Sequence, residues 1–131
     1  MLYLDSSAIV KLVTREPGTP ELVEAVRIEP EIVSSALAWT EVVRAVRRSG
    51  GRTTRAEAVL ERIGLVPVDE GIMRSAARLS PAGLRTLDAI HLASALSLAD
   101  DVAALVTYDA RLAEAAATAG LQVRAPGLES L

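Results

Sequence analysis

The chain has 131 residues, of which 50% are hydrophobic, 24% are charged and none is cysteine, and its formal net charge is −3 at pH 7. This composition excludes a disordered chain, and the length fits one domain over residues 1–131. The lack of cysteine excludes disulfides and thiolate metal sites and favours the reducing cytoplasm, while the acidic balance argues against a protein held on nucleic acid by bulk positive charge.

Short apolar segments alternate with helical patterns along the whole chain. In chain order the sequence predicts a strand at 2–4, a helix at 6–13, a helix from Thr19, a strand at 32–34, a helix at 36–48, a helix from Thr54 to about 63, a strand at 65–68, a helix after Asp69, a helix at 84–98, a strand at 104–107, a helix at 111–119 and a strand at 121–123. This order predicts an α/β fold of three layers, α/β/α, with a central parallel sheet of four to five strands.

Capping residues mark three of the predicted helix starts. Thr19 is followed by Pro20, a residue favoured in the first turn of a helix. Thr54 and Glu57 have the spacing of a capping box, and Asp69 directly precedes the next helical pattern. We therefore expect side-chain caps from Thr19, Thr54 and Asp69.

Two aspartates stand where predicted strands end. Asp5 follows the strand at 2–4, and Asp109 follows the strand at 104–107. Each is a suitable N-cap for the next helix, which is the simpler interpretation of either residue alone. One carboxylate oxygen is able to cap a helix while the other binds a metal, so both interpretations remain open. Ligands of parallel sheets bind beyond the carboxyl ends of strands, and the shared position of these aspartates is a first indication of a site.

Asp88 lies on an apolar stripe of its predicted helix, with Leu84 and Leu92. A carboxylate there is costly unless a partner satisfies it. An ion pair with Arg85, three residues earlier, is the structural alternative, but an exposed pair of this kind contributes only about 0.3–0.5 kcal/mol. A divalent cation is the better explanation of an acid at this position.

Glu41 lies at the border of the apolar face of its predicted helix. A surface ion pair with Arg44 or Arg48 is the structural alternative, and it is the simpler interpretation of this residue in isolation. Each of the four acids is therefore ambiguous by itself, and the evidence for a site lies in their combination.

That combination resembles a known family. The acids lie in four segments: 2–12 (LYLDSSAIVKL), 38–45 (AWTEVVRA), 84–95 (LRTLDAIHLASA) and 106–116 (VTYDARLAEAA). In this order and on these elements, the segments resemble the four acidic motifs of PIN domains, and more narrowly of VapC-type toxins of bacterial toxin–antitoxin pairs. The resemblance covers nearly the whole chain.

The resemblance implies an endoribonuclease that cleaves RNA with a metal-activated water and leaves a 5′-phosphate and a 3′-hydroxyl. It implies that Mg²⁺ or Mn²⁺ is held by Asp5, Glu41, Asp88 and Asp109, with supporting hydroxyls from Ser7 and Thr107. His91, in the third motif, is not implied as catalytic, and we interpret it as a packing or hydrogen-bonding residue.

The resemblance also implies partners, namely an RNA substrate, a cognate antitoxin that occupies the acidic cleft, and a second copy in a homodimer and a toxin–antitoxin hetero-oligomer. No stretch approaches the roughly 20 apolar residues of a membrane span, so we expect no membrane association. Seven arginines are candidates for contacts with the RNA backbone: Arg15, Arg44, Arg47, Arg48, Arg52, Arg55 and Arg85.

Two alternative functions remain at this point. A phosphoacceptor receiver domain also uses acids and Mg²⁺, and Asp69 ends a predicted strand, but such a domain requires a lysine after its last strand. The single lysine, Lys11, lies in the first predicted helix. A catalytically silent PIN-like binding or scaffold protein is the other alternative, and the presence of all four acids argues against it.

Overall fold

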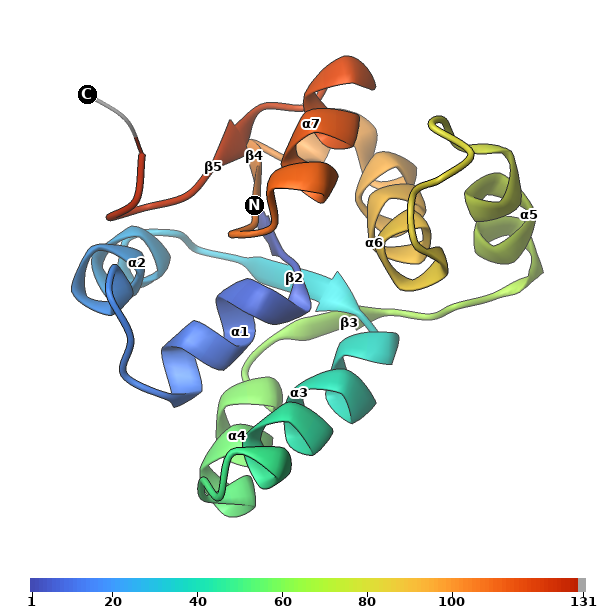
Figure 1. The fold of residues 1–131 in the computed structure, drawn as a ribbon. Helices are drawn as coiled ribbons and strands as arrows, with labels where there is room; N and C mark the ends of the chain where they lie inside the picture. Colours follow the sequence, from blue (N-terminus) through green and yellow to red (C-terminus); the bar gives the residue numbers. More distant parts are fainter. Residues whose placement is uncertain (130–131) are drawn as a thin grey trace.

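The computed structural model describes residues 1–129, in which five parallel strands form one sheet in the order β3-β2-β1-β4-β5 (Figure 1). Within these residues no helix is long and apolar enough to cross a bilayer. The elements are, in chain order, β1 (Leu2–Leu4), α1 (Ser6–Val13), α2 (Thr19–Arg27), β2 (Ile32–Ser35), α3 (Leu37–Arg48), α4 (Thr53–Leu60), β3 (Gly64–Val66), α5 (Glu70–Arg78), α6 (Thr86–Ser97), a 3₁₀ turn (Ala99–Asp101), β4 (Ala104–Val106), α7 (Ala110–Thr118) and β5 (Val123–Arg124).

Strand β1 lies at the centre of the sheet and pairs with β2 on one side and β4 on the other. The chain first builds outward through β2 and β3, then returns to the other side of β1 to add β4 and β5. The strand order therefore switches between β1 and β4. In the register of this pair Leu4 lies opposite Val106, so the residues that follow each strand, Asp5 and Thr107, emerge side by side. This confirms the predicted fold class.

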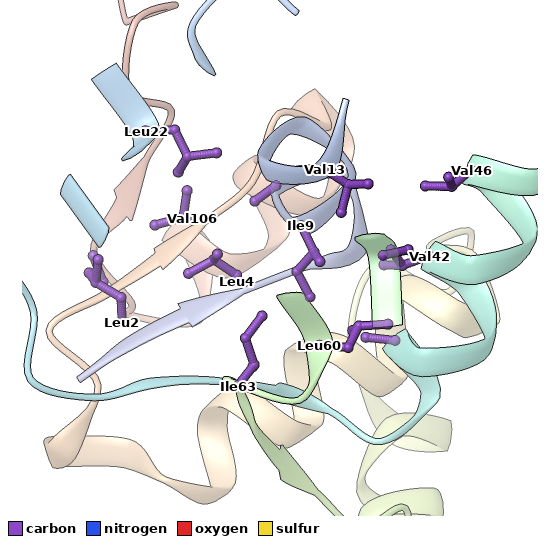
Figure 2. Packing of buried hydrophobic residues seen from close by; sticks show 14 residues of the cluster. Leu2, Leu4, Ile9, Val13, Leu22, Val42, Val46, Leu60, Ile63 and Val106 are labelled. Atoms are coloured by element: carbon purple, nitrogen blue, oxygen red, sulfur yellow. The ribbon is translucent and has the colours of Figure 1, made fainter. Parts of the chain in front are cut away.

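Alternate side chains of β1 point to opposite faces of the sheet, and each face has its own hydrophobic core. Leu2 and Leu4 pack with side chains of α1, α2, α3 and α4 on one face (Figure 2). Tyr3 packs on the other face with side chains of α6 and α7, and α5 covers α6. Each fully buried leucine or isoleucine contributes about 1.5–3 kcal/mol by leaving water, before the entropic cost of folding. Helices on both faces give the three layers seen in Figure 1.

The helix caps agree with the sequence at one of the three predicted positions. The Asp69 side chain accepts a hydrogen bond from the Ile72 backbone and caps α5, as expected. The N-cap of α2 is Gly18, whose φ of 95° suits glycine, while Thr19 lies inside the helix. Its hydroxyl instead donates to the Lys11 carbonyl, which ties α2 to α1.

The predicted capping box at Thr54 and Glu57 was wrong. Helix α4 begins one residue earlier, at Thr53, and its N-cap Arg52 makes no side-chain cap. The glycine pair that ends α3 sets the direction of the chain at this corner, because the Gly51 backbone nitrogen donates to the Val46 carbonyl. The start of α4 is therefore determined by the close turn from α3 rather than by a capping side chain.

Candidate active site

Asp5 is held at the end of β1 by three hydrogen bonds. Its Oδ1 accepts from the Ala8 backbone nitrogen at 3.0 Å and from Ser7 Oγ at 2.7 Å, and its Oδ2 accepts from Thr107 Oγ1 at 2.6 Å. The Asp5 residue is only 4% exposed. Burial raises the pKa of Asp5 above its ordinary value, although the three hydrogen bonds act in the opposite direction. The carboxyl group is thus fixed in place but is costly to keep ionised.

Thr107 connects Asp5 to Asp109. While its hydroxyl donates to Asp5, the same oxygen accepts from the Asp109 backbone nitrogen at 3.1 Å. Asp109 Oδ1 accepts from the Arg111 and Leu112 backbone nitrogens and caps α7. Both aspartates at strand ends therefore cap helices, as the structural interpretation predicted. They also lie at one place, because Thr107 bonds to both.

Glu41, on α3, turns toward the sheet rather than toward the arginines of its own helix. Its Oε1 accepts from Ser6 Oγ at 2.6 Å and pairs with His91 Nε2 at 2.8 Å. Partial burial acts to raise the pKa of Glu41, but the hydrogen bonds from His91 and Ser6, together with nearby positive charge, hold the pKa below its ordinary value. Among residues 1–129, no ion pair joins Glu41 to Arg44 or Arg48, so that alternative was wrong.

Arg85 joins the other two acids. Its Nε lies 3.1 Å from Asp88 Oδ2, and its Nη2 lies 2.7 Å from Asp109 Oδ2. The pair with Asp88 is the structural alternative considered for that residue, but the contact with Asp109 on another element was not predicted. Asp88 lies in the first turn of α6, where the positive end of the helix dipole favours a carboxylate. One guanidinium therefore holds two of the four acids.

The structure gathers the predicted residues through shared partners. Thr107 links two of the acids, Arg85 links two, and Glu41 lines a hollow of about 260 Å³ together with residues 85–88. Larger hollows of about 490 and 610 Å³ lie beside residues 80–84, but none of the four acids lines either of them. Four contacts at the site were not predicted from the sequence: those of Tyr3 with His91, Ser6 with Glu41, Arg85 with Asp109, and His91 with Glu41.

The acids do not form a ready-made ligand shell. Within residues 1–129, no three acidic or histidine side chains lie close enough together to hold a metal ion directly. Hydrogen bonds already engage both Asp5 oxygens, and the Arg85 guanidinium lies between Asp88 and Asp109. The arrangement suits an ion that keeps several waters and takes one or two carboxylates directly, as Mg²⁺ does.

Comparison with known proteins agrees with this geometry. The PIN-domain family model matches residues 2–118. The chain is 47% identical to ribonuclease VapC46 of Mycobacterium tuberculosis (strain ATCC 25618 / H37Rv), over 95% of this chain and 97% of that protein. It is 37% identical to ribonuclease VapC47 of M. tuberculosis (strain CDC 1551 / Oshkosh), over 97% of this chain and 98% of that protein.

Solved structures show the same fold at lower identity. The crystal structure of M. tuberculosis VapC20, a toxin that cleaves the sarcin–ricin loop, matches with a TM-score of 0.71 at 14% identity, over 92% of this chain and 96% of that one. A toxin–antitoxin complex from Klebsiella pneumoniae matches with a TM-score of 0.68 at 20% identity, over 83% of this chain and 87% of that one. With its strand order, its acids and its relatives, the chain belongs to the PIN-domain family, among the VapC-type ribonucleases.

Proposed function

We propose that this chain is a Mg²⁺-dependent endoribonuclease, with Mn²⁺ as a possible substitute ion, and that Asp5, Glu41, Asp88 and Asp109 hold the metal and its waters. The observation that carries the proposal is the Thr107 hydroxyl, which bonds to Asp5 and to the Asp109 backbone at the switch in strand order. Open parallel sheets bind their ligands at this place. Thr107 and Ser7 act as supporting hydroxyls by fixing the Asp5 carboxylate.

The donor atoms fit such an ion. All four side chains offer carboxylate oxygens, which Mg²⁺ and Mn²⁺ prefer. Arg85 already compensates part of the negative charge of Asp88 and Asp109. Asp5 is buried, which raises its pKa, and a nearby cation would stabilise its ionised form. Bound there, the ion would offset the charge of the scissile phosphate and supply an attacking hydroxide at neutral pH.

The protein's own groups orient the reaction. The hydrogen bonds of Asp5 and Glu41 fix these carboxylates from the sheet side, so they approach the cleft in one orientation. The Arg85 side chain is 66% exposed and is placed to contact a phosphate oxygen of the substrate. Water attack in line with the 3′ oxygen leaves a 5′-phosphate and a 3′-hydroxyl.

A basic surface of the protein, formed by arginines of residues 44–55, is available to the RNA backbone. Residues 44–55 contain five arginines and no acid, in a chain whose net charge is −3. Arg44, Arg47 and Arg48 line one hollow at the exposed end of α3, the helix that carries Glu41. A phosphate backbone that leaves the acidic site along α3 meets these charges, which favours RNA approach from this side.

We propose a toxin role in the cytoplasm, with a cognate antitoxin, a homodimer and a toxin–antitoxin hetero-oligomer. The structural neighbours support this role, because they include a VapBC-1 structure from nontypeable Haemophilus influenzae and VapBC2 from Rickettsia felis bound to promoter DNA. Expression of the chain alone should arrest growth, and co-expression of the neighbouring gene's product should restore it. Normal growth at high expression would contradict the toxin role.

The direct test is cleavage of total RNA with end mapping, in purified protein with Mg²⁺. We expect 5′-phosphate and 3′-hydroxyl ends from the wild type and a loss of at least about 100-fold in Asp5→Asn. Asp69→Asn is the matched control, because Asp69 caps α5 as Asp5 caps α1 but lies outside the site. Full cleavage by Asp5→Asn, or ends with a 2′,3′-cyclic phosphate, would overturn the proposal. RNA binding without cleavage would favour the scaffold alternative.

A further inference from the structure

A chain of hydrogen bonds runs from the middle of the sheet to Glu41. Tyr3, on the central strand β1, is completely buried, and its hydroxyl lies 2.9 Å from His91 Nδ1. His91, on α6, is 2% exposed, and its Nε2 lies 2.8 Å from Glu41 Oε1. The two rings meet edge to face, with centroids 5.9 Å apart. The function proposed above uses His91 only as a hydrogen-bond partner of Glu41 and gives Tyr3 no role, so the buried Tyr3–His91 contact needs an explanation.

For a neutral His91 ring beside a carboxylate, the hydrogen bonds of this chain place the ring proton on one nitrogen. A carboxylate only accepts hydrogen bonds, so a neutral His91 ring that bonds to Glu41 Oε1 carries its proton on Nε2. Nδ1 is then an acceptor and requires a donor. The Tyr3 hydroxyl, 2.9 Å from Nδ1, is the donor that meets it. Tyr3 thus fixes the tautomer of His91.

The fixed ring determines how Glu41 presents its two oxygens. Oε1 receives hydrogen bonds from both His91 and Ser6, which occupies its acceptor capacity. Oε2 accepts none of the hydrogen bonds found among residues 1–129, and Glu41 lines the hollow shared with Asp88. A glutamate without these donors would rotate freely about its side-chain bonds, and holding it in one rotamer is an entropic cost that the network has already met.

We propose that Tyr3 and His91 are positioning residues, which lock Glu41 with Oε1 toward the sheet and Oε2 toward the metal and its waters. This proposal rests on the proposed function. It differs from a purely structural role, in which a tyrosine and a histidine fill space beneath the site. Outer partners of metal ligands commonly change metal affinity or activity 10- to 100-fold when they are removed, so the effect is measurable.

The chain offers an unusually clear test, because His91 is its single histidine. In ¹⁵N-labelled protein without a histidine tag, the imidazole nitrogens report the tautomer directly, without metal or substrate. At alkaline pH, we expect a single ring proton, on Nε2, in the wild type. In Tyr3→Phe, which keeps the ring but removes the donor, we expect a mixture of both tautomers. A wild-type proton on Nδ1 would overturn the proposal.

The second measurement is Mn²⁺ affinity by calorimetry, with kcat and KM for RNA cleavage. For Tyr3→Phe we expect Mn²⁺ binding about 10-fold weaker and a lower kcat with an unchanged KM. His91→Leu should show the larger loss, and His91→Gln, whose amide is able to donate to Glu41, should recover part of it. Tyr108→Phe is the matched control, since it removes a hydroxyl that donates to the Pro126 carbonyl, away from Glu41.

The results separate this proposal from the proposed function. If Tyr3→Phe lowers stability as Tyr108→Phe does but leaves Mn²⁺ affinity and kcat unchanged, Tyr3 and His91 have only a packing role and the proposal is wrong. Failure of the wild-type protein to bind Mn²⁺ would overturn the proposed function and this inference with it. Binding by the wild type that the Tyr3 exchange does not weaken would overturn this inference alone.

Discussion

The sheet side and the solvent side of the acidic site are held by different kinds of partner. On the sheet side, Asp5 and Glu41 accept hydrogen bonds from hydroxyls, a backbone amide and an imidazole that lie within the fold. On the solvent side, Asp88 and Asp109 share one guanidinium, on a side chain that is 66% exposed. Groups within the fold fix the first two acids, whereas Oδ2 of Asp88 and Oδ2 of Asp109 are held by an exposed charge that a ligand is able to replace.

This difference indicates that the two sides of the site differ in rigidity. A buried donor that is lost leaves an unsatisfied polar group and costs about 1–3 kcal/mol, so the sheet side is rigid. An exposed ion pair is screened by water and salt, so the solvent side rearranges at little cost. The rigid carboxylates of Asp5 and Glu41 are able to determine how the ion is coordinated. The Arg85 ion pairs are able to open and admit the substrate.

Among the groups that support the acids, Thr107 on the sheet side should have the largest effect. Thr107→Val keeps the shape of the side chain but removes the hydroxyl that bonds to Asp5 and to the Asp109 backbone. We expect RNA cleavage to fall about 10- to 100-fold and the free energy of unfolding to fall by about 1–3 kcal/mol. Thr107→Ser, which retains the hydroxyl, should restore most of both. Wild-type cleavage by the valine variant would show that this side is not pre-organised by Thr107.

A smaller effect of opposite sign is expected on the solvent side. Arg85→Gln removes the charge between Asp88 and Asp109, so these carboxylates should attract Mn²⁺ more strongly, by roughly 2- to 5-fold. Calorimetry at low salt measures this change, and Arg74→Gln, on the exposed face of α5, is the control. Weaker Mn²⁺ binding by Arg85→Gln would place Arg85 among the rigid groups and remove the contrast between the two sides.

The smallest expected effect is a change with pH in the free energy of unfolding, which the titration of Asp5 causes. Because burial raises the pKa of Asp5, the folded state favours the protonated carboxyl, and the ionised form lowers stability above that raised pKa. This cost disappears as the pH falls through the raised pKa toward the ordinary value of 3.8. In chelator, the wild type should therefore gain stability relative to Asp5→Asn as the pH falls from 7 through the raised pKa, on top of the constant cost of the Thr107 hydrogen bond that the variant loses. Chemical unfolding at several pH values measures this difference.

The fold followed from the sequence because its signals are local. The strand at 2–4 and the helix at 6–13 appear in the structure with the predicted bounds. Alternation of short apolar strands and helices gave the parallel sheet and its helical layers, and the four acidic motifs indicated the family. The capping box at Thr54 was wrong because the close turn after α3 decides where α4 begins, and a three-residue pattern contains no information about that turn.

The partners within the site were harder to predict, because they come from distant parts of the chain. Glu41 has arginines three and seven residues later, and a helix pattern naturally pairs it with them. Its actual partners lie 35 residues earlier, at Ser6, and 50 residues later, at His91. Tertiary packing places α3 so that Glu41 faces the sheet, and helical periodicity alone does not predict that orientation. The position of the acids was therefore predictable from the sequence, but their hydrogen bonds were not.

The bond between Thr107 and Asp5 joins residues 102 positions apart, and β1 receives β4 as its second neighbour only from residues 104–106. During synthesis, the chain therefore lacks β4 and Thr107 until most of its residues have been added. Fragments from interrupted translation contain Asp5 but neither the hydroxyl that orients it nor the strand that closes the sheet beside it. Because the first strand is central, the site is completed only by one of the last strands of the chain.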